Sequence, residues 1–152
     1  MRKIALLLVL ITSGIRPICA GENGDNILLG VWSGGGTASR AIYGTLVISK
    51  KQISWQGETP SSSCRTTYTV VERGTSDRYP NMNGEPTPGR TYRTFKLRLG
   101  PPECTENHGS FLFAFPSNAE GYVEVVTYDK NGRATGVVDF IKHALRPGDI
   151  KK

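Results

Sequence analysis

Apolar and polar residues alternate along most of the chain, with the period of two that is typical of a β-strand with one buried face. In the run IYGTLVIS, one face takes Ile42, Leu46 and Ile48, and the other takes Tyr43, Thr45 and Val47. Eight such runs follow one another: ILLGVWS, IYGTLVIS, QISWQ, TTYTVVE, TYRTFKLRL, SFLFAF, YVEVVTY and TGVVDFIK. No stretch longer than a turn or two has helical periodicity after residue 20. The pattern predicts an all-β domain of eight strands.

The segments between these runs are short and rich in Gly, Pro, Asn and Ser, which are turn-forming residues. Short links favour antiparallel strands that pair in chain order. Eight such strands remove their exposed edges by closing, so we expect a small antiparallel up-and-down barrel, with a two-sheet β-sandwich as the alternative. Alternating strand directions then sort the links. One end collects residues 34–40, 59–63, 100–108 and 129–132, and the other collects residues 50–51, 74–90 and 117–120.

The first twenty residues have the layout of a secretory signal peptide. Arg2 and Lys3 precede an apolar run, Ile4 to Ile11, which is too short to span a bilayer as a helix, and Ala20 suits the position before a cleavage point. We therefore expect a signal peptide over 1–20, a single β domain over 21–145 and a loose C-terminal tail over 146–152. The mature chain is expected in the periplasm or outside the cell, with no stable membrane span.

Export also determines whether the cysteines are expected to form a disulfide. Cys19 leaves with the signal, so Cys64 and Cys104 remain, and two cysteines in an oxidising compartment usually pair. Cys64 begins one predicted strand and Cys104 follows the next, and an antiparallel pair of strands brings those positions to the same end. The sequence therefore predicts a Cys64–Cys104 disulfide.

Charge and composition argue against several functions. The chain carries 19 Lys+Arg and 13 Asp+Glu, but three of the basic residues lie in the predicted signal, so the mature charge falls from +6 to +3. A charge of +3 spread along the sequence does not predict nucleic-acid binding, which needs a clustered basic face. His108 lies near Glu103 and Glu106, but the spacing fits no zinc motif. We expect no metal and no cofactor, with His108 and His143 as solvated residues.

The stretch GVWSGGGTASR, from Gly30 to Arg40, matches neither a nucleophile elbow nor a phosphate-binding loop. We interpret it as a mobile hairpin turn. Gly30 and Trp32 resemble the Gly-x-Trp of lipocalins and their relatives, which begins the first barrel strand there. The resemblance is confined to two residues of one motif and carries no functional prediction.

Catalytic patterns are also missing from the sequence. A triad built on Ser33 or Ser39 with a histidine has no supporting local arrangement. Glu124 and Asp139 lie in strand-like segments and would form an acid/base pair on an inner wall, but alternation favours outward, solvated positions. We therefore expect a protein that is not an enzyme. A hydrolase with an unrecognised site near His108 remains as a contrasting hypothesis.

Three features favour recognition of a partner. In TYRTFKLRL, the inward face takes Phe95, Leu97 and Leu99. The outward face is then a basic aromatic stripe of Tyr92, Thr94, Lys96 and Arg98. The long loop over residues 74–90 offers Tyr79 and Met82 as contact residues. In FLFAF both faces are apolar, as in a central strand covered on both sides or in a strand with an exposed phenylalanine row.

The functional expectation is an exported, non-enzymatic binding domain that recognises another protein through its loops, such as an inhibitor or immunity-type factor. The candidate contact residues are Tyr79, Met82, Tyr92, Lys96 and Arg98. The alternative is a barrel that carries a small apolar ligand in its interior, motivated by the supply of aromatic residues.

Overall fold

The structure is a computed structural model and describes residues 24–78, 89–101 and 108–143. The predicted signal peptide and C-terminal tail lie outside these residues. So do Tyr79, Met82 and Cys104, together with Glu103 and Glu106.

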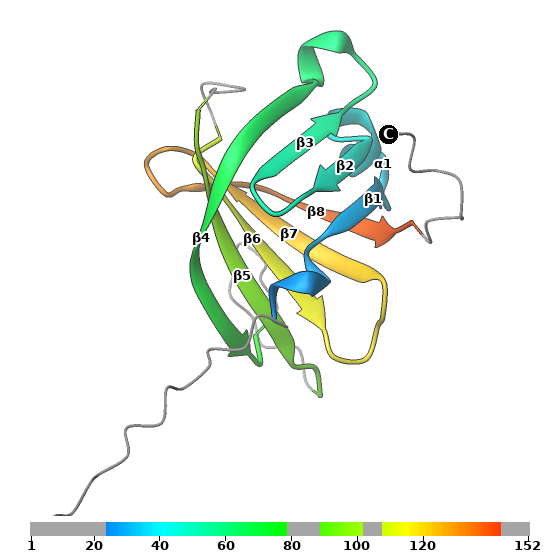
Figure 1. Cartoon of the computed structure of the whole chain (residues 1–152). Coiled ribbons are helices and arrows are strands. Elements are labelled where there is room, and N and C mark those ends of the chain that lie inside the picture. Colours follow the sequence, from blue (N-terminus) through cyan, green and yellow to red (C-terminus); the bar gives the residue numbers. More distant parts are fainter. Residues whose placement is uncertain (1–23, 79–88, 102–107, 144–152) are drawn as a thin grey trace, which may run out of the picture.

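Eight antiparallel strands close into a single up-and-down barrel, as the alternation predicted (Figure 1). Each strand pairs with the next along the chain, and the first pairs with the last, with Trp32 opposite Lys142. The strands are β1 (Gly30–Gly34), β2 (Thr45–Ile48), β3 (Gln52–Gln56), β4 (Cys64–Ser76), β5 (Tyr92–Leu99), β6 (Ser110–Pro116), β7 (Tyr122–Tyr128) and β8 (Ala134–Lys142).

Three short helical segments accompany the barrel. They are the 3₁₀ turn η1 (Asp25–Ile27), the helix α1 (Thr37–Ile42) and the 3₁₀ turn η2 (Pro60–Ser62). The α1 end of the barrel carries the β1–β2, β3–β4, β5–β6 and β7–β8 links, and the η1 end carries the other three (Figure 1). This division agrees with the one expected from the sequence.

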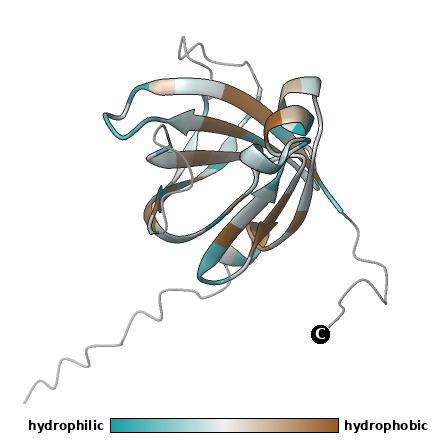
Figure 2. Cartoon of the chain, turned by 90° about the horizontal axis from the view of Figure 1, so that it is seen from above, coloured by the Kyte–Doolittle hydropathy of each residue, from teal (hydrophilic) through white to brown (hydrophobic). Residues whose placement is uncertain are grey.

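Side chains of the barrel's own strands fill its interior. Inward residues alternate with outward ones along each strand, and Figure 2 shows the apolar segments distributed around the whole barrel. The largest fully buried side chains of this core are Trp32, Phe111, Phe113 and Phe140. A barrel of eight strands is just wide enough for its side chains to occupy the centre, and the aromatic residues do so here.

The phenylalanines of FLFAF belong to this hydrophobic core. Phe111, Phe113 and Phe115 all belong to the core, and Ala114, on the opposite face of β6, is also buried. β6 is therefore a central strand that is covered on both sides, and an exposed phenylalanine row is not present.

The link between β1 and β2 differs from the expected mobile turn. Residues 37–42 form α1 instead of extending β2, and Ile42 is exposed whereas Tyr43 is buried. Gly44 has a positive φ of 52°, which turns the chain between the helix and the strand. Ile42 therefore does not share the inward face of Leu46 and Ile48, as the alternation had suggested.

Candidate binding surface at one end of the barrel

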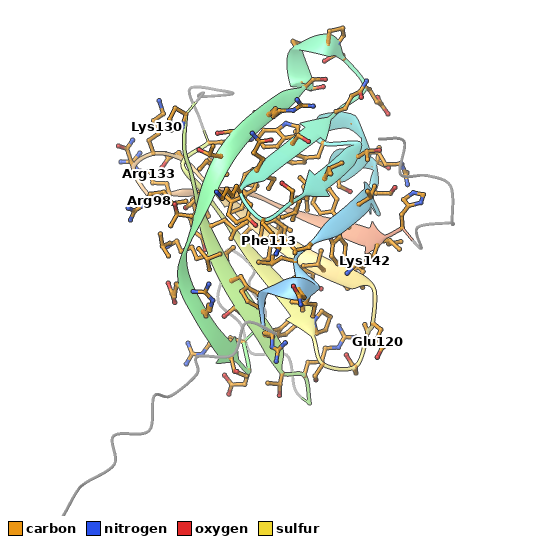
Figure 3. The ribbon with its side chains drawn as sticks, in the orientation of Figure 1. Arg98, Phe113, Glu120, Lys130, Arg133 and Lys142 are labelled. Atoms are coloured by element: carbon orange, nitrogen blue, oxygen red, sulfur yellow. The ribbon has the colours of Figure 1, made fainter. Side chains whose placement is uncertain are left out.

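A cleft of about 820 Å³ opens at the α1 end of the barrel. Its cationic residues are Lys96 and Arg98 from β5 and Lys130 from the β7–β8 turn, and we call it the basic cleft. Figure 3 shows Arg98, Lys130 and Arg133 projecting on the same side of the barrel. The wall between β4 and the β5–β6 link is held by backbone hydrogen bonding, because Gly100 N donates to Thr67 O at 2.9 Å.

Two carboxylates, Asp129 and Glu72, also line the basic cleft. Asp129 Oδ1 accepts hydrogen bonds from Asn131 N and Arg133 N, both at 2.8 Å, and so fixes the turn that carries Lys130. Glu72 lies opposite Lys96 in the pairing of β4 with β5. Arg98 and Lys130 are the exposed cations of the cleft, and Arg98 forms no ion pair with any other residue in the described ranges.

The Lys96 side chain is held against an aromatic ring. Its Nζ lies 5.1 Å from the centroid of the Tyr128 ring, within the range of a cation–π contact. Burial raises the pKa of Tyr128, and the negative charge of Glu72 raises it further. Tyr128 therefore stays neutral at physiological pH, and the charges at this wall of the cleft are those of Lys96 and Glu72.

The outward stripe of β5 is only partly available for contacts. Lys96 is half-buried and Arg98 is exposed, and both line the basic cleft. Tyr92 faces away from the interior as expected, but its exposed fraction is 0%, so it cannot present its ring to a partner. The expectation that Tyr92 contacts a partner is thus corrected, since alternation gives the direction of a side chain but not what covers it. Tyr79 and Met82 lie outside the described residues.

An aromatic cluster closes the barrel interior beneath the basic cleft. Tyr43, which follows α1, has an exposed fraction of 3% and reaches inward over the barrel. Its ring lies 5.7 Å from that of Trp55, and 5.9 Å from those of Phe111 and Phe140, measured between centroids. This role of Tyr43 was not expected from the sequence, in which the local signal is the glycine that follows it.

His108 is part of this cluster and is not the solvated residue that the sequence suggested. Its ring is half-buried, stacks on Tyr43 at 6.0 Å between centroids, and lies 5.6 Å from the ring of Phe111. The Tyr43 hydroxyl and His108 Nε2 are hydrogen-bonded at 3.0 Å. Because this nitrogen is engaged by a buried phenol, the geometry shows a structural role for His108. His143, by contrast, is exposed as expected.

The glycine-rich stretch has a structural explanation in the contacts between α1 and β8. Asp139 Oδ1 accepts hydrogen bonds from Gly36 N at 3.0 Å and from Ser39 Oγ at 3.4 Å. A Cβ atom added to Gly35 would lie 2.2 Å from Asp139 Oδ2, so the close approach requires glycine. Ser39 is buried, and its single hydroxyl proton is shared between Asp139 Oδ1 and Gly36 O, which lies 2.9 Å from Ser39 Oγ. These contacts anchor α1 to the barrel wall and do not present a nucleophile.

Glu124 and Asp139 lie opposite each other on β7 and β8. Both face outward, because their neighbours Val123, Val125 and Phe140 belong to the core. Outward positions agree with the expectation, but Glu124 is not solvated: its exposed fraction is 3%, and Tyr122 OH donates to its Oε1 at 3.3 Å. The pair therefore does not line an inner wall, where an acid/base site had been considered.

Within residues 24–78, 89–101 and 108–143, no three His, Cys, Asp or Glu side chains are grouped so that they could hold a metal ion. No helix in these same ranges is long and apolar enough to cross a membrane. Cys64 opens β4 opposite Trp55, and because Cys104 lies outside the described residues, their pairing stays a prediction.

No family model, curated protein or solved structure matches the chain.

Proposed function

We propose that the mature chain is an exported, non-enzymatic binding protein that recognises an acidic surface of another protein through the basic cleft. The observation that carries the proposal is the placement of Lys96, Arg98 and Lys130 around one open cleft at a barrel end. An inhibitor or immunity-type factor would act in this way, by covering a site on its target.

Electrostatic complementarity supports this choice of partner. The basic cleft carries three cations and two carboxylates, and an excess of one charge speeds the encounter with an oppositely charged surface and disfavours wrong partners. Arg98 is exposed and can form paired hydrogen bonds with a carboxylate, which is the recognition mode that arginine favours. The Asp129 hydrogen bonds hold the neighbouring turn in place, so fewer side-chain and loop motions are lost on binding.

Packing supports a surface site over the alternative of a ligand carried inside. The barrel centre holds Phe113, Leu97 and Ile53, all with exposed fractions of 0%. A ligand in that position would have to displace several close-packed side chains, at a cost of the order of several kcal/mol. We therefore place recognition on the outside of the barrel.

A paired set of charge variants tests the proposal. Lys96→Gln/Arg98→Gln removes two positive charges from the basic cleft, whereas Lys50→Gln/Lys51→Gln removes two from the β2–β3 link at the η1 end. Each purified protein is immobilised and exposed to an extract of its own compartment, and captured proteins are identified by mass spectrometry. The strongest captured protein is then purified and its affinity is measured by calorimetry at two salt concentrations.

The cleft variant should bind this partner at least tenfold more weakly than the unaltered protein, with a weaker dependence on salt. The η1-end variant should bind as the unaltered protein does. Equal losses in both variants would mean that only net charge matters, and equal binding by all three proteins would place recognition elsewhere. Either result contradicts the proposal.

Export is part of the same proposal, because the proposed partner lies outside the cytoplasm. N-terminal sequencing of protein recovered from the native host should find a mature chain that begins at Gly21. Recovery of a chain that keeps Met1 would remove this part of the proposal.

A further inference from the structure

A second cleft, of about 660 Å³, opens at the η1 end of the barrel. Its floor is apolar and comes from η1, β1 and β6, through Ile27, Trp32 and Phe115. Its cations come from two other strands, Arg93 on β5 and Lys142 on β8. We call it the η1 cleft, and Figure 3 shows Lys142 and Glu120 on this side of the molecule.

Contacts with the floor of the η1 cleft position one of these cations. Lys142 Nζ lies 5.1 Å from the centroid of the Trp32 ring and 3.5 Å from Ile27 O. Trp32 is fixed in turn, because its Nε1 donates to Leu28 O at 3.0 Å. The ammonium group therefore sits above an aromatic surface at the edge of the cleft.

Arg93 has no such contacts. It is exposed, and it lies between Thr75 of β4 and Phe115 of β6 in the strand register. Within the described part of the chain it makes no hydrogen bond and no ion pair. An exposed guanidinium on a strand position next to a buried phenylalanine is suited to pair with a carboxylate.

We infer that the η1 cleft binds a small amphipathic monocarboxylate. Arg93 pairs with the carboxylate and Lys142 adds a second positive charge, while the apolar part of the ligand covers Ile27 and Phe115. Glu120, which is exposed at the rim of the cleft, repels ligands that carry several negative charges. A single carboxylate attached to an apolar body is thus the chemistry that fits the cleft best.

The η1 cleft is distinct from the basic cleft. Arg93 and Arg98 lie toward opposite ends of β5, and each lines only one of the two clefts. Binding at the η1 cleft can therefore be lost while partner recognition at the basic cleft is kept, and the reverse also holds.

Calorimetric titration of the mature chain with decanoate tests the inference, with decanol and acetate as comparison ligands. Decanoate should bind at one site, more tightly than decanol, which lacks the charge, and than acetate, which lacks the apolar chain. Arg93→Gln should weaken decanoate binding about tenfold, since a hydrogen bond to a charged group is lost. The matched variant Arg98→Gln, on the same strand, should bind decanoate as the unaltered protein does.

Circular dichroism and thermal unfolding establish that both variants are folded. The inference is overturned if decanoate shows no saturable binding, if decanol binds equally well, or if Arg93→Gln and Arg98→Gln have the same affinity. None of these results would alter the comparison between charge variants that tests the basic cleft.

Discussion

Tyr43 offers the sharpest test of how the α1 end is closed. Its hydroxyl is hydrogen-bonded to His108 Nε2 at 3.0 Å and to the side chain of Thr127, and its ring lies among four other rings. Tyr43→Phe keeps the ring but leaves two polar partners inside the barrel end without this hydroxyl. We expect a loss of about 1–3 kcal/mol in the free energy of unfolding. Tyr43→Ala also removes the ring, and the expected loss rises to about 3–5 kcal/mol.

Urea denaturation followed by circular dichroism measures both losses. For a domain of this size, an m-value of about 2 kcal/mol/M turns the Tyr43→Phe loss into a midpoint shift of about 1 M. The control is Tyr128→Phe, because the Tyr128 hydroxyl donates to no other described residue, and its cost should stay within about 0.5 kcal/mol. If Tyr43→Phe costs no more than Tyr128→Phe, the hydrogen bonds of Tyr43 do not stabilise the closure.

The same variant predicts a dependence on pH. Burial raises the pKa of Tyr43 to about 12, with the hydrogen bond to Thr127 opposing the shift, whereas an unfolded tyrosine titrates near 10. The folded state therefore favours the neutral phenol. Its contribution is complete below pH 10 and is lost as the pH rises through 12, by up to about 3 kcal/mol. The stability of the unaltered protein should fall over this range more steeply than that of Tyr43→Phe. Parallel curves would contradict the reasoning.

Other contacts make separate predictions. Asp139→Ala should cost about 1–2 kcal/mol by thermal unfolding, because two hydrogen bonds to the α1 segment are lost. Gly35→Ala should cost about 1–3 kcal/mol alone but clearly less in the Asp139→Ala background, where the clashing oxygen is gone, and a double-mutant cycle that shows simple additivity would contradict this. Lys142→Met should cost about 1 kcal/mol through the lost contact with the Trp32 ring, as measured by urea denaturation. Non-reducing peptide mapping should find Cys64 linked to Cys104, and reduction should cost about 2–4 kcal/mol, whereas two alkylatable thiols would disprove the pairing.

The architecture could be predicted because hydrophobic alternation and short links are properties that the chain carries locally. Phe95 and Leu97 point inward and Lys96 and Arg98 point outward, as alternation requires once one face of β5 is buried. Closure followed from the number of strands and from links too short for crossovers. The sorting of links between the two ends needed only the alternating strand directions.

The details of the site depend on contacts between distant segments and could not be predicted in the same way. Ile42 and Tyr43 match a strand pattern, but over so few residues a helical turn fits equally well. In the structure the helix ends at Ile42, and Gly44, with its positive φ, turns the chain into β2. His108 becomes part of an aromatic cluster only when the β5–β6 link meets Tyr43. The burial of Tyr92 depends on what covers the outer wall, which alternation within β5 does not encode.

The placement of the partner on the barrel tests the account most directly. Lysine cross-linking of the native complex, followed by mass spectrometry, reports which barrel end faces the partner. Lys96 and Lys130 line the basic cleft, while Lys50 and Lys51 lie in the link at the η1 end. We predict cross-links from the first pair of lysines to the partner and none from the second pair. Cross-links confined to Lys50 and Lys51 would contradict recognition by the basic cleft.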